Sequence, residues 1–187
     1  MDKKVKLLLG LLAFAVMMGA AVMAYQFLTE QGYGPENLAR EDARDENREA
    51  APDFAMLDAD GNELRLSDFF GAPIVLNFWA TWCPACVIET PHFETLYLEM
   101  GNEIHVIKVN LLDGQRETRA AVDRFMEEQG YTFSLYFDKA GEAASAYGIR
   151  GIPQTIFIDA EGYIVARLMG AASEQELRAG IAAARGN

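Results

Sequence analysis

The sequence predicts an α/β fold, a three-layer sandwich in which helices cover both faces of a mixed central sheet. Near-continuous apolar runs, such as residues 74–79, have the composition of fully buried strands. Between these runs lie segments with apolar residues at helical spacing, as in residues 119–129. Two strand-like runs near the C-terminus are joined by a short glycine turn, which indicates an antiparallel hairpin. The sheet is therefore expected to be mixed rather than all parallel.

Length and composition fit one domain with an N-terminal appendage. The chain has 187 residues and 51% hydrophobic content, enough for one core of about 130 residues. Its net charge of −12 argues against nucleic acid as a partner but identifies no other partner. No internal repeat is present.

Residues 1–28 are expected to be a cytoplasmic start followed by a transmembrane signal-anchor. Residues 7–28 are almost wholly apolar, about 22 residues or roughly 33 Å as a helix, which is enough to span a bilayer. Lys3, Lys4 and Lys6 precede the segment, so the rest of the chain should lie outside. The alternative is cleavage near residues 22–24, which loosely fit a signal peptidase site. Either way the cysteines lie outside the cytoplasm, where disulfide-bearing clients occur.

Residues 29–50 are expected to form an acidic tether. Little in this stretch can pack into a core, because seven acidic residues and three arginines dominate it after an early glycine and proline cluster. We expect it to lift the folded domain, residues 51–187, away from the membrane.

The folded domain should open with a hairpin and a short helical turn. Residues 54–57 and 63–66 are strand-like and flank Asp58-Ala59-Asp60-Gly61. Ser67 and Asp68 can cap a helical turn that ends at Gly71. Residues 74–79 then form the first central strand.

Helices and strands alternate after that strand. Phe93, Leu96, Tyr97 and Met100 give one helix an apolar face, and Gly101 can end it. The next elements are a strand over 104–110, a helix over 119–129, a strand over 133–137 and a helix over 138–147. After a loop at 148–153, strands over 154–159 and 163–168 form the second hairpin. Ser173 and Glu176 make a capping box for the closing helix, whose apolar face includes Leu177, Ile181 and Ala184.

The only two cysteines, Cys83 and Cys86, lie two residues apart directly after the central strand. A strand that leads into a Cys-x-x-Cys opening a helix puts the first sulfur at the helix N-terminus. Unsatisfied N–H groups and the helix dipole favour a thiolate there. The second sulfur lies one turn further in. This arrangement predicts thiol redox chemistry.

The cysteine pair has two other interpretations. A tetrahedral zinc site needs four ligands, and only His92 and His105 remain as histidine candidates on separate predicted elements. A purely structural disulfide closing so short a loop would remove little chain entropy. We therefore expect neither a metal nor another cofactor.

The sequence resembles the thioredoxin superfamily, and most closely its membrane-anchored bacterial branch of TlpA, ResA and CcmG/DsbE type. The resemblance rests on residues 77–86 with Glu89, Pro91 and the later Gly151-Ile152-Pro153, and it covers residues 51–187. It implies a thioredoxin-like three-layer sandwich with an N-terminal hairpin and one inserted helix and strand, at residues 119–137.

The resemblance also implies the active site. Cys83 would attack a client disulfide, Cys86 would resolve the mixed disulfide, and Trp82, Pro84, Ala85, Ile152 and Pro153 would shape the substrate groove. An X-Pro bond is the one peptide bond that readily becomes cis, and the matching family proline is cis and faces the cysteines.

In function, the resemblance points to a disulfide reductase at the bacterial cell membrane, single-pass, with its redox domain outside. Its clients would be secreted proteins such as apocytochrome c, and a CcdA- or DsbD-type membrane thiol transporter would supply electrons. The sequence does not fix the direction of electron flow, because thioredoxin-fold proteins span a wide range of potentials.

Glu89 is the residue that we expect to accept a proton from Cys86. Thioredoxin has a buried acid six residues before its first cysteine, and this chain has Asn77 there, which cannot titrate. Glu89 follows Cys86 by three residues, so both side chains should lie on one helix face. A matching Glu occurs in the ResA-like branch. The other interpretation is an ordinary solvated helix glutamate.

Two further functions remained open. Pro52-Asp53-Phe54 before a hairpin also occurs in peroxiredoxins, but their peroxidatic cysteine usually follows Thr or Ser by three residues, and this chain has Ala80 there. A binding module without turnover is the other alternative, which the intact cysteine pair disfavours.

Overall fold

The computed structural model describes residues 14, 17–19, 22–23, 48–138 and 140–186. Most of the expected signal-anchor at residues 1–28, and the tether except residues 48–50, lie outside the described residues. Within the described part of the chain, no helix is both long and apolar enough to cross a membrane.

The folded unit begins at Arg48 and is built on an eight-stranded mixed sheet. The strand order is β1-β8-β7-β4-β5-β6-β2-β3. Three neighbouring strands are parallel: β4 (Ile74–Trp79), β5 (His105–Asn110) and β6 (Leu135–Phe137). The others pair antiparallel: β1 (Glu49–Ala50), β2 (Ala55–Leu57), β3 (Glu63–Arg65), β7 (Gln154–Ile158) and β8 (Tyr163–Met169). The mixed sheet predicted from the sequence is confirmed.

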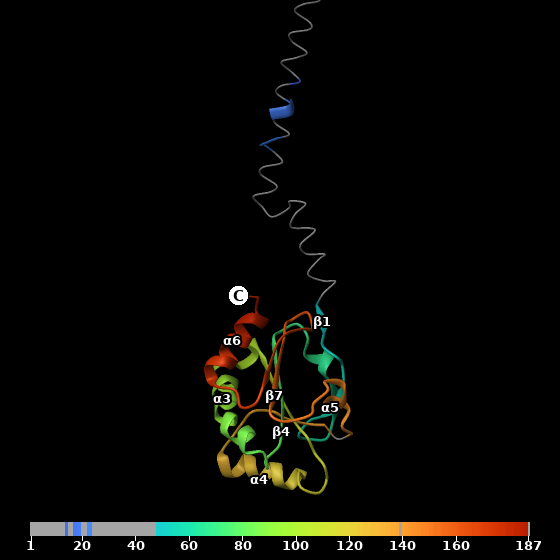
Figure 1. Ribbon diagram of the computed structural model, residues 1–187, viewed down its shortest axis with the longest axis vertical. Coiled ribbons are helices and arrows are strands. Elements are labelled where there is room, and N and C mark those ends of the chain that lie inside the picture. Colours follow the sequence, from blue (N-terminus) through green and yellow to red (C-terminus); the bar gives the residue numbers. More distant parts are fainter. Residues whose placement is uncertain (1–13, 15–16, 20–21, 24–47, 139, 187) are drawn as a thin grey trace, which may run out of the picture. The chain divides into compact units, whose positions relative to one another are not determined.

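Helices cover both faces of the sheet, as the alternating side chains of β4 require. Ile74, Leu76 and Phe78 pack in one core cluster, whereas Val75 packs in another with residues of α3 and α6. Figure 1 shows α3 (Pro84–Met100) and α6 (Glu174–Ala184) together on one side and α5 (Glu142–Ala146) on the other. The short helix η1 (Leu66–Phe69) contributes Leu66 to the cluster that contains Ile74. The three-layer sandwich is confirmed.

Local capping explains where the helices begin and end. Thr118 accepts a hydrogen bond from the Ala121 N–H at the start of α4 (Arg119–Gln129), and Gly130 ends it with a left-handed φ of 70°. Ser173 and Glu176 form the predicted capping box of α6. These bounds match the sequence-based ones because the signals are local.

Three elements differ from the sequence-based expectation. Residues 49–50, placed in the tether, form β1 against Ile164 and Tyr163 of β8. The strand expected over 133–137 is shorter, because the Phe133 N–H donates a hydrogen bond to the Glu94 carboxylate and not to a neighbouring strand. The helix expected from Asp138 starts at Glu142, because the Asp138 carboxylate accepts hydrogen bonds from the N–H groups of residues 143 and 144.

Candidate functional site

The cysteines lie where the central strand β4 passes into helix α3. Cys83 is the N-cap residue of α3 and Pro84 occupies the first turn, where its missing N–H costs nothing. Cys83 and Cys86 form a disulfide with their Cα atoms 5.2 Å apart. The Cys86 N–H points at the Cys83 Sγ at 3.2 Å. In the reduced protein this N–H and the helix dipole would stabilise negative charge on Cys83.

The two sulfurs differ in their access to solvent. Cys83 keeps 4% of its surface exposed and Cys86 none. Both cysteines belong to one core cluster with Trp79, Val122 and Phe133, but only Cys83 keeps any exposed surface. Of the two cysteines, only Cys83 therefore offers surface to a reagent in solution.

The loop before β7 lies directly against Cys83. The Ile152–Pro153 bond is cis, and the Ile152 carbonyl oxygen is 3.6 Å from the Cys83 Sγ. The Gly170 N–H donates to the Pro153 carbonyl oxygen and ties this loop to the end of β8. The expected cis proline beside the cysteines is confirmed.

The other predicted groove residues surround the disulfide with different exposure. Trp82 is 39% exposed and Pro84 is also exposed, whereas Ala85 and Ile152 are half-buried and Pro153 is buried. The exposed members present apolar surface beside the one accessible sulfur.

Glu89 is fully buried beneath the disulfide and is not a solvated helix residue. Its carboxylate accepts hydrogen bonds from the Asn77 Nδ2 at 2.8 Å and from the Ala172 N–H at 2.9 Å. Burial raises the pKa of Glu89, and Lys108 and these two hydrogen bonds offset part of the rise. Among the described residues no hydrogen bond joins Glu89 to Cys86, so a proton would pass between them through a water or after a side-chain movement.

Lys108 is a second buried charged group in the same layer. Its Nζ donates to the Asn77 Oδ1 at 2.9 Å and lies 4.0 Å from the centre of the Phe93 ring. Burial lowers the pKa of Lys108 to about 7, although Glu89 opposes this shift. Asn77 thus links the two side chains: its amide oxygen accepts a hydrogen bond from Lys108, and its amide nitrogen donates one to Glu89. We call Lys108, Asn77 and Glu89 the buried relay.

Sequence reasoning missed two members of the buried relay. It treated Asn77 only as the absence of an acid, and it gave Lys108 no role within the strand expected over 104–110. The available signal was a polar residue inside each of two runs that are otherwise apolar, since buried polar groups need partners. Their partners could not be read from the sequence, because β4, β5 and α3 meet only in the folded chain.

Glu117 is a further buried carboxylate that sequence reasoning missed. It accepts hydrogen bonds from the Thr81 N–H at 2.8 Å, the Thr81 hydroxyl at 2.7 Å and the Asn110 Nδ2 at 2.5 Å. Because Thr81 lies two residues before Cys83, these contacts hold the loop between β5 and α4 against the turn that carries the nucleophile.

The weighed zinc site has no counterpart among the residues that the structure describes, where no three His, Cys, Asp or Glu side chains are grouped to hold a metal. His105 packs edge-on against Phe69 with ring centroids 5.3 Å apart.

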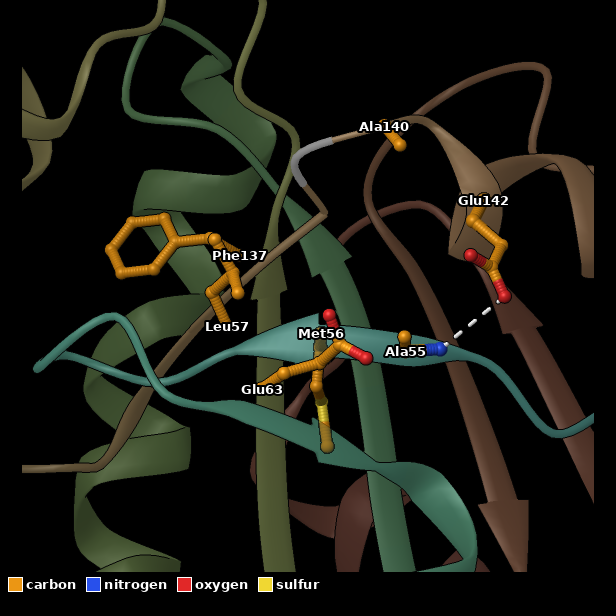
Figure 2. A pocket seen from close by; sticks show the side chains of 7 residues that line it. All are labelled: Ala55, Met56, Leu57, Glu63, Phe137, Ala140 and Glu142. Atoms are coloured by element: carbon orange, nitrogen blue, oxygen red, sulfur yellow. Dashed lines mark hydrogen bonds between the residues drawn. The ribbon is translucent and has the colours of Figure 1, made fainter.

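A separate pocket of about 150 Å³ lies at the end of the sheet formed by β6, β2 and β3. The cysteines are not among its lining residues. Figure 2 shows its lining side chains, including Met56, Phe137 and Glu142. Glu142 accepts a hydrogen bond from the Ala55 N–H there.

Comparisons with known proteins agree with this geometry. The sequence profile of the AhpC/TSA family matches residues 48–167. The thiol-disulfide oxidoreductase ResA of Bacillus cereus is 31% identical over 178 residues, covering 94% of this chain and 94% of that protein.

Two solved structures share the fold. A putative thiol:disulfide interchange protein DsbE from Chlorobium tepidum has a TM-score of 0.65 at 28% identity, covering 73% of this chain and 96% of that one. The exposed lipoprotein thioredoxin Etrx1 of Streptococcus pneumoniae has a TM-score of 0.61 at 28% identity. The match covers 70% of this chain and 98% of that one.

Proposed function

The chain belongs to the AhpC/TSA family and is a ResA-like thiol-disulfide oxidoreductase, and from this premise we propose that it reduces disulfide bonds of secreted proteins outside the cytoplasm. The observation that carries the proposal is the difference in solvent exposure between the two cysteines. Cys83 is accessible at a helix N-terminus beside a cis proline, whereas Cys86 is sealed in the core.

The reaction balances as two thiol exchanges. The Cys83 thiolate attacks one sulfur of the client disulfide, an S–S bond forms between them, and the other client sulfur leaves as a thiolate. Cys86 then loses its proton and attacks the Cys83 sulfur. The client leaves with both sulfurs reduced, and the enzyme keeps the Cys83–Cys86 disulfide and has given up two electrons. A dithiol donor must then reduce the enzyme again.

Glu89 is the group that we assign to accept the Cys86 proton. A buried thiol resists ionisation and needs a base nearby. Burial raises the pKa of Glu89 toward that of a thiol, which lowers the cost of the transfer. Asn77 holds the carboxylate by a hydrogen bond, and Lys108, which bonds to the other end of the Asn77 amide, lowers the pKa of Glu89 where it is protonated.

The setting of the proposal is the outer face of the bacterial cell membrane. Residues 1–28 would anchor the chain in a single pass and residues 29–50 would tether the domain. A neighbour described as an exposed lipoprotein supports an external location. Apocytochrome c is the client class that we propose, with a CcdA- or DsbD-type membrane thiol transporter as electron donor.

A thiol peroxidase is the second candidate, because the AhpC/TSA profile spans the cysteines and Pro52-Asp53-Phe54. The position three residues before Cys83 is Ala80, which is buried and has no hydroxyl to offer a peroxide. Peroxide consumption with a thiol donor, measured beside disulfide exchange, separates the two. Peroxide turnover as fast as disulfide exchange would favour the peroxidase.

Trapping the mixed disulfide tests the order of attack. In the full chain in detergent, Cys86→Ser should accumulate a covalent adduct with a disulfide-bonded client, seen on a non-reducing gel. Cys83→Ser should give none. Equal adduct from both variants would contradict the assignment. Equilibration of the wild type with glutathione tests the direction, and a potential near about −120 mV, like that of DsbA, would contradict a reductase.

A further inference from the structure

An exposed aromatic and cationic rim borders the accessible sulfur. The Arg116 guanidinium carbon lies 4.1 Å from the centre of the Trp82 ring, and Trp82 immediately precedes Cys83. Arg150 is exposed in the loop that leads to Ile152, whose carbonyl oxygen faces the Cys83 sulfur. We call Trp82, Arg116 and Arg150 the rim.

The position of Arg116 is set by the fold. Its neighbour Glu117 is buried and bonded to Thr81 and Asn110. Asp113, at the start of the same loop, accepts hydrogen bonds from the Gln115 and Glu117 N–H groups through a single oxygen, at 2.8 Å each. The loop is thus closed on itself and fastened beside Cys83, so it presents the Arg116 side chain to the same place.

The rim arginines differ from most arginines of the folded unit in making no ion pair with a carboxylate among the described residues. Elsewhere arginines pair with acids, in the pairs Arg48–Asp159, Arg65–Asp53, Arg119–Asp123, Arg167–Glu49, Arg178–Glu99 and Arg185–Glu103. Within the described part of the chain, no ion pair or hydrogen bond of the side chain is seen for Arg116, Arg150 or Arg124 of α4. In a chain with a net charge of −12, two guanidinium groups without an ion pair, on the loops that flank Trp82 and Ile152, add positive charge near Cys83. The Asp113 carboxylate of the Arg116 loop interacts electrostatically with Arg116 and offsets part of its charge.

We propose that the rim binds carboxylates that flank the disulfide of the client, so that acidic client segments exchange faster than basic ones. This inference rests on the proposed function and specifies its substrate class. A guanidinium group stacked on an aromatic ring still presents its N–H edge, which matches a carboxylate in two parallel hydrogen bonds. Charge complementarity at such a rim acts mainly on the rate of encounter.

The test uses three two-cysteine peptide disulfides that share one loop and differ in flanking residues: two Glu, two Gln or two Lys. The reduced full chain in detergent is mixed with each, and the second-order exchange rate is measured from the change in tryptophan fluorescence. The Glu peptide should react about threefold to tenfold faster than the Lys peptide, and this ratio should fall with added salt.

Arg116→Gln and Arg150→Gln should each reduce the ratio of Glu to Lys peptide rates, and together they should bring it close to one. Arg185→Gln is the matched control, because it removes the same charge at the C-terminal end of α6, where Arg185 pairs with Glu103. Its ratio should equal that of the wild type.

The possible outcomes distinguish a failure of the rim proposal from a failure of the proposed disulfide reductase function. Failure of the wild type to exchange with the Gln peptide would contradict the proposed reductase. Normal exchange with no preference for the Glu peptide, or a preference unchanged in the double variant, would overturn the rim proposal. An equal loss of rate on all three peptides in Arg116→Gln would also overturn it, because Arg116 would then act on the disulfide rather than on the client.

Discussion

The two sides of the disulfide are built in opposite ways. Beneath it, Glu89 and Lys108 are charged groups fully enclosed in the fold and joined by Asn77. Above it, Trp82 and Arg116 stack in contact with solvent. Buried charges lose hydration and gain strong coupling, whereas exposed ones are screened. The buried relay should therefore govern how protons move, and the rim should govern which client arrives.

A large effect is expected from Lys108→Met. Without the ammonium group the pKa of Glu89 rises further, so a smaller fraction of the carboxyl groups is ionised and able to accept a proton. Resolution of the mixed disulfide should slow about tenfold or more at pH 7 and recover as the pH rises. Stopped-flow rates over pH 6 to 9 measure this.

A double-mutant cycle is the control for that variant. If Lys108 acts through Glu89, Lys108→Met should slow resolution little in a Glu89→Gln background. Full additivity of the two effects would assign Lys108 a structural role only. Circular dichroism establishes that each variant is folded.

The buried relay should also make the free energy of unfolding depend on pH. The native pKa of Lys108 is about 7, below its ordinary 10.5, so between these values the unfolded chain holds a proton that the native protein lacks. The free energy of unfolding should therefore increase as the pH rises from about 7 to 10.5. This added stability disappears as the pH falls back toward 7. The double variant Glu89→Gln, Lys108→Met should lack this rise. Denaturant titrations of the oxidised proteins at pH 7.5 and 9.5 compare them, and parallel behaviour would contradict the assigned shift.

Substitution in the rim should have a smaller effect than substitution in the buried relay, and it should change KM for the client and not the rate of resolution. Trp82→Ala removes exposed apolar surface beside Cys83, so KM for a client should rise about threefold to tenfold while the rate of resolution stays unchanged. Leu98→Ala is the control, since Leu98 is likewise exposed but lies near the other end of α3. A change in resolution rate with KM unaltered would remove the distinction between the two sides.

Local patterns predicted the scaffold and the reacting atoms. The bounds of β4 and α4, the capping box of α6 and the cysteines at the start of α3 all follow from residues close in sequence. Helical spacing put Glu89 on the same helix as Cys86, but its burial depends on Asn77 and on Ala172, which is 83 residues away. The contact between Glu117 and Thr81 spans 36 residues and leaves no pattern in the sequence.

The most direct test of the central claim, that Glu89 accepts the Cys86 proton, is the pH profile of mixed-disulfide resolution in Glu89→Gln. The account predicts a raised apparent thiol pKa and resolution slower by about tenfold to a hundredfold, with the fold intact. Glu94→Gln, the same change on the same helix at a residue bonded to Thr132, should match the wild type. Resolution rates in Glu89→Gln that equal those of the wild type from pH 6 to 9 would contradict the claim and leave water as the proton acceptor.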